Sequence, residues 1–388
     1  MSRPRLEIVF AAENLLPPIG GAERVTLEWL EELAGRHAVR AVWVAGEEAA
    51  PAPEGVEPLP VARPRDGGGY WLTKRLRAGA VARGVDATLD ERPADVVLTG
   101  LHAGPAAVAA GRRHGAATVV ALHSYEALCK FAFAPASACR PSSHCRACPA
   151  AQALGPVERR ELFAARDAHE RSLADADGLV APSRFVAGAC ESWCGRRPVV
   201  VPSVSAAPLP LPASPRGHVL LAAARWTGHK GRDLLEPLAE ALAPRPFVVT
   251  EDGLDAALRR RLAVLPHVQI RAGGPIEALL CGARAVLVPS QWPEPFGRVA
   301  FEGMASGVPA IASAVGGLQE VVPAPQLVDP PDSPAAWVAA VEALEEPARW
   351  ARARDAGIRA ARAIAAPPAV ERLEAVLLDA ARAGCTTS

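Results

Sequence analysis

Two glutamates eight residues apart, Glu294 and Glu302, are spaced to hold one polar ligand. They follow the strand pattern Ala285–Val288, which breaks at Pro289-Ser290. Glu294 precedes a predicted helix, and Glu302 lies inside it, roughly 7 Å further along the axis. The unpaired N–H groups and positive dipole end of a helix N-terminus favour an anionic group there. The two carboxylates can accept hydrogen bonds from different hydroxyls of one extended ligand, and a sugar nucleotide has that shape. Acidic residues also favour a helix start on electrostatic grounds alone.

Two cations stand at another predicted strand end. Arg225 and Lys230 lie beside glycines in AAARWTGHKGRDLL, directly after the strand pattern His218–Ala223. Cations placed in this way can neutralise a diphosphate and stabilise charge on a leaving group. The alternative is an ordinary solvated loop with two exposed charges.

The N-terminal half has its own candidates. Gly20-Gly21 precedes a predicted helix, where glycines let backbone N–H groups approach a phosphate closely. His123 ends the strand pattern Thr118–Leu122, which places an imidazole at the sheet edge. Taken alone, each of these features is more often structural.

The elements that position these residues alternate between strand and helix, which predicts parallel sheets covered by helices. The proline-rich stretch Pro202–Pro215 predicts a linker. We therefore expect one Rossmann-like domain over 1–205 and a second over 216–370, facing each other across a cleft. Residues 371–388 are expected to form a helix, and Glu47–Gly69 is expected to be a loop.

Composition narrows the class of protein. The 388 residues suit two domains, and 42 acidic against 42 basic residues create no global field for nucleic acid or membrane. No window approaches the ~20 apolar residues of a membrane span, and no signal peptide is evident. We expect a cytoplasmic protein, and the sequence does not indicate its oligomeric state.

Four cysteines form a separate cluster with the spacing C-x9-C-x5-C-x2-C. Thiolates at this spacing in a Pro- and Ser-rich loop over 129–148 suit a closed, structural zinc site, and His144 is a substitute ligand. Reduced free cysteines and an iron–sulfur cluster are the alternatives. The predicted ligands are Cys129, Cys139, Cys145 and Cys148.

The string PS-x-x-x-E-P-F-G-x-x-x-x-E-x-x-x-x-G-x-P, from Pro289 to Pro309, closely resembles the donor-site signature of family-4 glycosyltransferases, which have the GT-B fold. The string R-x-x-x-x-K-G-x-D-x-L, from Arg225 to Leu235, is similar to that family's donor-phosphate motif. The family commonly has H-D where this chain reads His123-Ser124, so a role for that Asp does not carry over. The resemblance covers most of the chain and is strongest over 218–322. It also implies that the helix over 371–388 crosses back to the first domain.

The resemblance implies a retaining transfer of a glycosyl group from a nucleoside diphosphate sugar to a hydroxyl or amine. UDP-sugars are favoured as donors over GDP-sugars, and the acceptor is a small molecule or glycan. We assign no D-x-D motif to a divalent ion, so catalysis is expected to need no metal cofactor. By analogy, His123, Arg225, Lys230 and Glu294 act in catalysis. The implied donor-binding residues are Gly20, Gly21, Arg225, Lys230, Glu251, Arg271, Glu294, Pro295, Phe296, Gly297 and Glu302.

The sequence also leaves other functions open. The GT-B fold also hosts sugar-nucleotide epimerases and phosphorylases, although no acid/base pair for an epimerase is evident. A non-catalytic subunit that binds sugar nucleotides is a further alternative. A dehydrogenase is disfavoured because neither half has G-x-G-x-x-G after its first strand. The expected setting is a bacterial pathway for a secondary metabolite or a surface glycan.

Overall fold

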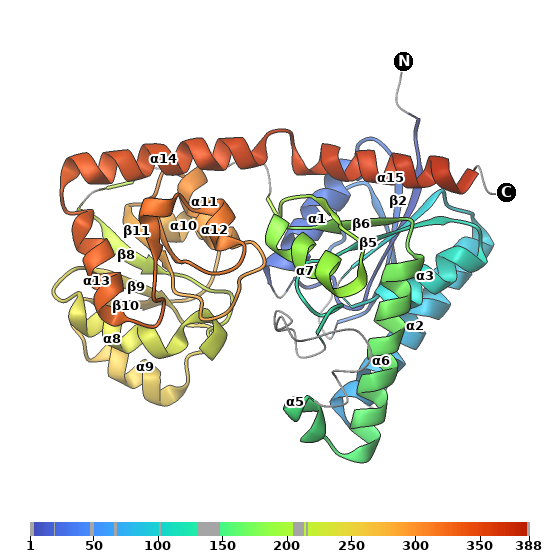
Figure 1. The fold of residues 1–388 in the computed structure, drawn as a ribbon, viewed down its shortest axis with the longest axis horizontal. Helices are drawn as coiled ribbons and strands as arrows, with labels where there is room; N and C mark the ends of the chain where they lie inside the picture. Colours follow the sequence, from blue (N-terminus) through green and yellow to red (C-terminus); the bar gives the residue numbers. More distant parts are fainter. Residues whose placement is uncertain are drawn as a thin grey trace. The chain divides into compact units, whose positions relative to one another are not determined.

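The computed structural model describes residues 4–18, 20–46, 50–65, 68–100, 102–129, 148–204, 213–214 and 216–385. The chain divides into two compact units (Figure 1). Unit 1 comprises Met1–Ser203 with Pro368–Ser388, and unit 2 comprises Val204–Pro367. Within the described residues, no helix has the length and apolar character needed to cross a bilayer.

Unit 1 is built on a parallel sheet with the strand order β3-β2-β1-β4-β5-β6-β7. Its central strands are almost wholly apolar, as expected for strands covered on both faces. The strands are β1 (Glu7–Ala12), β2 (Ala38–Val44), β3 (Val56–Val61), β4 (Val96–Thr99), β5 (Ala117–Ala121), β6 (Gly178–Ala181) and β7 (Val199–Val200).

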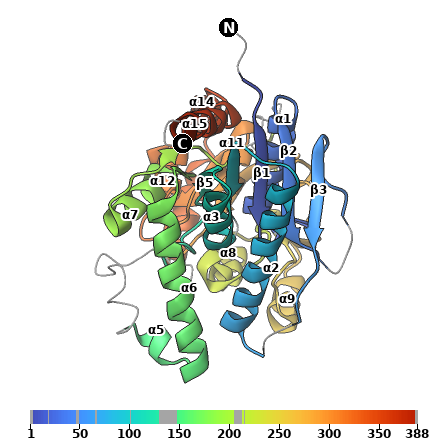
Figure 2. The ribbon, with the colours of Figure 1, turned by 90° about the vertical axis from the view of Figure 1, so that its right-hand side faces the viewer.

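Helices cover both faces of this sheet. The helices α2 and α3 pack on one face with α6 against them, and α1 and α15 pack on the other (Figure 2). The helices of the unit are α1 (Gly21–Ala34), α2 (Tyr70–Glu91), α3 (Gly104–Arg113), α5 (Pro149–Gln152), α6 (Pro156–Asp175), α7 (Arg184–Cys194) and α15 (Ala369–Cys385).

Unit 2 repeats this plan with the parallel strand order β10-β9-β8-β11-β12-β13. Its strands are β8 (His218–Leu221), β9 (Phe247–Thr250), β10 (Val268–Arg271), β11 (Ala283–Val288), β12 (Ala310–Ser313) and β13 (Leu327–Val328). Its helices are η1 (Gly228–Lys230), η2 (Arg232–Leu234), α8 (Leu235–Ala241), α9 (Ala256–Ala263), α10 (Ile276–Leu280), α11 (Arg298–Ala305), α12 (Leu318–Val321), η3 (Ala324–Gln326), α13 (Pro334–Ala343) and α14 (Pro347–Ala365).

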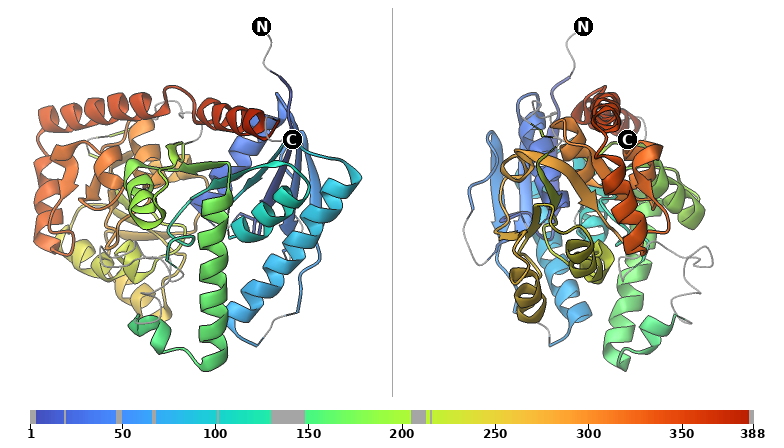
Figure 3. Two further views of the ribbon diagram at one scale, coloured as in Figure 1. Left: turned by 45° about the vertical axis from the view of Figure 1, so that its right-hand side comes forward. Right: turned by 90° about the vertical axis from the view of Figure 1, so that its left-hand side faces the viewer.

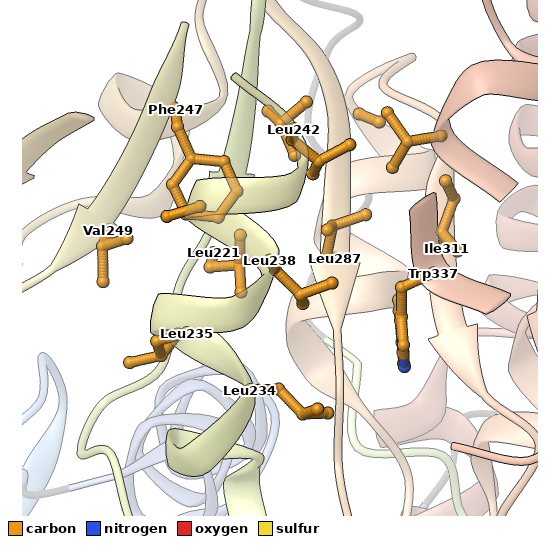
Figure 4. Close-up of a cluster of buried hydrophobic side chains, with 14 of the residues drawn as sticks. Leu221, Leu234, Leu235, Leu238, Leu242, Phe247, Val249, Leu287, Ile311 and Trp337 are labelled. Atoms are coloured by element: carbon orange, nitrogen blue, oxygen red, sulfur yellow. The ribbon is translucent and has the colours of Figure 1, made fainter. Parts of the chain in front are cut away.

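The core of unit 2 lies between its sheet and helices α8, α9 and α13. Leu235, Leu238 and Leu242 recur on one face of α8 and pack against Phe247 and Leu287 of the strands (Figure 4). Each of these side chains is fully buried, which contributes about 1.5–3 kcal/mol apiece. This core fixes the loops that follow the strands.

The prediction of two Rossmann-like α/β domains is confirmed. The predicted strands Thr118–Leu122, His218–Ala223 and Ala285–Val288 agree with the structure to within two residues. The prediction of a loop over Glu47–Gly69 was wrong, because β3 lies inside it. Pro58 and Pro60 obscure this strand in the sequence. Both occupy alternate positions of an edge strand that pairs only with β2, so the missing N–H groups point away from the sheet. The linker prediction falls mostly on 205–212, outside the described residues.

Helix α15 is joined to unit 1 by a buried polar cluster. Glu374 is 1% exposed, and its carboxylate accepts a 2.8 Å hydrogen bond from Arg36 Nη1. His37 Nε2 lies 3.2 Å from the other carboxylate oxygen, and His37 Nδ1 accepts from the Leu6 N–H. Burial lowers the pKa of His37. The cluster ties the last helix to the first strand and first helix of the unit.

Candidate functional site

The candidate site lies at the carboxyl ends of the strands of unit 2. In the order β10-β9-β8-β11-β12-β13, the chain reverses its direction of winding between β8 and β11. Loops diverge at such a switch point and leave a crevice for ligands. The loop after β8 carries Arg225 and Lys230, and the loop after β11 carries Glu294. The structure therefore brings the two principal motifs to one place.

Lys230 and Glu294 contact each other directly. The Lys230 ammonium lies 2.6 Å from Oε1 and 2.8 Å from Oε2 of Glu294. The Ser290 hydroxyl donates to the same carboxylate at 2.9 Å and the Trp292 indole N–H at 3.1 Å. The Glu294 side chain is 11% exposed and that of Lys230 is 35% exposed. The carboxylate is thus fixed by three donors, while solvent and ligands can still reach the ammonium.

Glycines allow the loops to approach this pair. Gly316 has φ +54°, and a Cβ there would lie 2.6 Å from the Glu294 carbonyl oxygen. The neighbouring Gly317 N–H donates to that carbonyl at 2.7 Å. Gly231, with φ +78°, packs directly against Pro289. The backbone on both sides of the ion pair is therefore set by positions that favour glycine.

The remaining residues of the Glu294 motif lie on α11 or just before it. Phe296 is buried against Phe301, with ring centroids 6.1 Å apart, and Gly297 has φ +98°. Glu302 is the fifth residue of α11, and its carboxylate accepts from Arg298 at 2.9 Å and 3.1 Å. In this structure the Glu302 carboxylate is held by its own helix.

Two other predicted donor-binding residues lie further along the same sheet edge. Glu251 follows β9, one strand from β8, and is paired with Arg259 at 2.8 Å. Arg271 ends β10, two strands from β8, and donates to Gln269. Strands are spaced about 4.8 Å apart, so Arg271 lies farthest from the Lys230–Glu294 pair. Arg225 is exposed, and its side chain passes close to Gly253 at the end of β9.

His123 lies in unit 1, where it is buried against α1. Its Nε2 is 3.2 Å from the Thr26 hydroxyl, and its ring centroid is 5.6 Å from that of Trp29. Thr26 donates its single hydroxyl proton to the Ala22 carbonyl, so His123 Nε2 is the donor and Nδ1 carries a lone pair. Burial lowers the pKa of His123 to about 4, and the Glu126 carboxylate opposes this shift in part. The imidazole is neutral at pH 7 and can accept a hydrogen bond at Nδ1.

Gly20 and Gly21 begin α1, as predicted. Gly20 is the N-cap residue, and its N–H donates to the Glu23 carboxylate at 3.0 Å. The chain thus places its own anion at this helix start, in line with the preference of such a terminus for negative charge.

The cysteine cluster is described only at its ends. Cys129 and Cys148 are described and half-buried, whereas Cys139, His144 and Cys145 lie outside the described residues. Among the residues that are described, no group of three or more His, Cys, Asp or Glu side chains is arranged to hold a metal ion. The zinc prediction stays a prediction.

One literal D-x-D sequence occurs, Asp175-Ala176-Asp177, after α6. The Asp177 carboxylate accepts from the Thr118 N–H at 2.7 Å and from the Thr118 hydroxyl at 3.1 Å. It ties the amino end of β5 to β6, the opposite edge of the sheet from the carboxyl ends. This position gives the carboxylate a structural contact.

Sequence reasoning missed several residues of the site. Ser290 stands in the matched string, but its bond to Glu294 needs the loop geometry. Trp292 and His229 stack with centroids 5.9 Å apart, and Lys230 Nζ lies 5.7 Å from the Trp292 ring centroid. These contacts join segments about 60 residues apart, so no local sequence pattern predicts them.

Comparison with known proteins identifies the kind of domain in each half. Residues 19–203 match the model described as Glycosyltransferase Family 4, and residues 261–363 match Glycosyl transferases group 1. Both halves therefore carry glycosyltransferase domains.

A 175-residue stretch is 34% identical to D-inositol 3-phosphate glycosyltransferase 1 of Catenulispora acidiphila. It covers 43% of this chain and 41% of that relative. A shorter stretch is 46% identical to an uncharacterized glycosyltransferase of Methanocaldococcus jannaschii, over 13% of each chain. These curated relatives are matched over less than half of their length.

Solved structures establish the fold class. Sucrose-phosphate synthase of Thermosynechococcus elongatus is 20% identical and covers 99% of both chains with a TM-score of 0.71. HepE of Anabaena, in complex with UDP-glucose, is 18% identical and covers 96% of this chain and 98% of its own, with a TM-score of 0.69. The chain has the GT-B type of fold, which confirms the predicted class.

Proposed function

We propose that this protein is a retaining glycosyltransferase that moves a sugar from a nucleoside diphosphate sugar to an acceptor hydroxyl or amine without a divalent ion. Glycosyltransferase domains in both halves and the GT-B fold support this proposal. The observation that carries it is the Lys230–Glu294 pair at the switch point of unit 2, with Arg225 in the same loop as Lys230.

In the proposed reaction, the bond from the anomeric carbon to the diphosphate oxygen breaks and a bond to the acceptor oxygen or nitrogen forms. The acceptor proton passes to the leaving phosphate oxygen, so no protein base is assigned. Lys230 and Arg225 stabilise the negative charge that develops on the leaving diphosphate. Glu294 orients Lys230 and, with the Phe296 and Gly297 amides, holds the sugar; Glu302 binds the ribose. His123 accepts a hydrogen bond from the sugar at Nδ1.

We favour a UDP-sugar as the donor, with a GDP-sugar as the alternative. HepE, a structural neighbour, was solved with UDP-glucose. The pathway we favour is bacterial secondary metabolism, with surface-glycan synthesis as the alternative. A glycotransferase of kitacinnamycin and the lipopolysaccharide enzyme WaaG are both among the structural neighbours, so these do not separate the two settings.

A thermal-shift screen tests the donor. Protein treated with EDTA is mixed with UDP-glucose, GDP-mannose, dTDP-glucose or ADP-glucose. One donor at 100 times its Kd should raise the Tm by about 5 °C or more, because binding stabilises only the folded state. Lys230→Ala should abolish this shift, whereas Arg261→Ala should keep it. Arg261 is a matched control because it forms a similar ion pair with Glu236 on the surface of unit 2.

Two results would contradict the proposal. One is the absence of a shift with every nucleotide sugar, and the other is a full shift in Lys230→Ala. Incubation of the stabilising donor without acceptor, followed by NMR of the sugar, separates the rivals. An epimer would indicate an epimerase, and inertness with every acceptor despite binding would indicate a non-catalytic subunit.

We also propose a structural zinc ion held by Cys129, Cys139, Cys145 and Cys148, with no open position for a substrate. Metal analysis of freshly purified protein should find about one zinc per chain, lost in Cys148→Ser. A matched substitution, Cys281→Ser, removes an exposed cysteine of unit 2 and should leave the zinc content unchanged. Iron in place of zinc would support a cluster instead, and the absence of both metals would indicate free thiols.

A further inference from the structure

Unit 1 contains a cavity of about 280 Å³ at its own switch point. Winding reverses between β1 and β4, and the cavity is lined by Glu13 after β1, His102 after β4 and Glu126 after β5. Helices α2, α3 and α6 form its walls; they are the blue, teal and long green helices of Figure 3. By fold geometry, this is where a ligand of unit 1 would bind.

The end of the cavity nearest the sheet is polar. His102 has φ +73°. Residues other than glycine seldom adopt this backbone conformation, and it recurs at functional positions. Glu126 is 7% exposed, and its carboxylate accepts a hydrogen bond from the Ser124 hydroxyl. Burial alone would raise the pKa of Glu126, but His102 and Ser124 outweigh it and lower the pKa. An ionised carboxylate beside an imidazole suits a ligand hydroxyl.

The other charged groups of the wall are already paired with one another. Lys74 lies 2.9 Å from the Glu13 carboxylate, and Arg75 lies 3.2 Å from the Glu161 carboxylate. Lys74 and Arg75 are therefore each neutralised by a neighbouring glutamate. A phosphate or carboxylate on the ligand would have to compete with these carboxylates, so the lining favours an uncharged ligand.

The end away from the sheet is apolar and carries aromatic rings. Tyr70 and Trp71 begin α2, with ring centroids 4.9 Å apart in an edge-to-face arrangement. The Glu158 carboxylate of α6 accepts from the Trp71 N–H at 2.9 Å and fixes this helix start. Across the cavity, α6 presents Ala164, Ala165 and Ala168, which lie on one helix face. Small side chains facing aromatic rings leave room for a flat, apolar body.

We propose that this cavity is the acceptor pocket of the transferase and that it takes an uncharged, ring-containing alcohol or phenol. The hydroxyl lies at His102 and Glu126, and the apolar body lies between Trp71 and the alanine face of α6. This inference rests on the proposed function, because an acceptor needs a donor. It narrows the acceptor from any small molecule or glycan to a hydroxylated, mostly apolar ring system.

The test measures binding of defined probes without any donor. The ring probes are 4-methylumbelliferone and estradiol; the polar probes are maltose and myo-inositol 1-phosphate. Calorimetry should show at least one ring probe binding to the full chain and no binding of either polar probe at the same concentration. Ala168→Leu should weaken the ring probe at least tenfold by filling the cavity. Ala174→Leu, on an exposed turn of the same helix, is the matched control and should bind as the original chain does.

Several outcomes would overturn the inference: no ring probe binds, Ala168→Leu binds with unchanged affinity, or a polar probe binds and is blocked by Ala168→Leu. Ala164→Leu, at an exposed position of the lining, gives a second block if Ala168→Leu does not fold. The donor thermal shift is measured separately and reports on the Lys230–Glu294 site of unit 2, which contributes no residue to the cavity. A lost donor shift with intact ring binding would sink the proposed function, and the reverse would sink only the acceptor assignment.

Discussion

The two units share one strand order up to their sixth strand, yet their switch points differ in chemistry. In unit 2 the loops after β8 and β11 are joined by Lys230 and Glu294, and Gly316 and Gly231 let the backbone pack closely around them. In unit 1 the loops after β1 and β4 contribute Glu13 and His102 to a cavity that is also lined by alanines and aromatic rings. Parallel topology thus fixes where ligands bind, and the loop residues decide which ligands.

The cationic side chains also differ between the two switch points. In unit 2 the ammonium of Lys230 is accessible from solvent, while its partner carboxylate is held by two further donors. In the cavity of unit 1, Lys74 and Arg75 are occupied by glutamates. The first arrangement suits an anion such as a diphosphate, and the second suits an uncharged ring.

Glu294→Gln should reduce kcat/KM about 10²–10³-fold, because an amide cannot hold the Lys230 ammonium in place for the leaving group. The measurement is steady-state transfer with the donor found in the thermal-shift screen. Glu236→Gln removes a carboxylate from the surface pair with Arg261 and should leave kcat/KM unchanged. Equal rates for Glu294→Gln and the original chain would remove Glu294 from the mechanism.

Gly316→Ala should lower the free energy of unfolding by about 1–3 kcal/mol, since φ +54° is unfavourable for alanine and its Cβ would press on the Glu294 backbone. Donor affinity should fall with it, because the same loop positions Glu294. Urea unfolding and calorimetry measure the two effects. Gly274→Ala is the control, because no atom lies within 4 Å of a Cβ there. An unchanged donor Kd in Gly316→Ala would show that this loop does not position the site.

The pH dependence of stability should come in part from His123. Its pKa falls from 6.5 to about 4 on folding, so between these values the unfolded chain binds a proton that the folded chain does not. Stability should therefore decrease as the pH falls from 6.5 toward 4 and then level off. Between pH 7.5 and pH 5.0 the free energy of unfolding should fall by about 1–2 kcal/mol less in His123→Asn than in the original chain. Urea unfolding at the two pH values measures this difference. Gly274→Ala, which changes no titratable group, should keep the original pH dependence.

The sequence predicted much of the fold because buried parallel strands are continuous apolar runs. The predicted strands Thr118–Leu122, His218–Ala223 and Ala285–Val288 correspond to β5, β8 and β11, which all lie in the interior of a sheet. Strand β3 was missed because Pro58 and Pro60 are tolerated only at an edge, and edge position is a property of the sheet. Local pattern therefore identifies central strands better than edge strands.

The two sites also differ in how far the local sequence predicts them. Lys230 and Glu294 each stand in a local string, although their direct contact spans 64 residues. The cavity of unit 1 draws Glu13, Lys74, His102, Glu126 and Glu161 from five separate segments, and none belongs to a recognisable motif. Only the folded chain brings these side chains together, so no sequence pattern could predict the cavity.

Calorimetric titration of the stabilising nucleotide sugar into Lys230→Ala and Ala168→Leu is the most direct test of whether the donor binds in unit 2 independently of the cavity in unit 1. Separate donor and acceptor sites predict at least a hundredfold loss of donor affinity in Lys230→Ala and an unchanged donor Kd in Ala168→Leu. Donor binding that survives Lys230→Ala, or that is lost in Ala168→Leu, would contradict it.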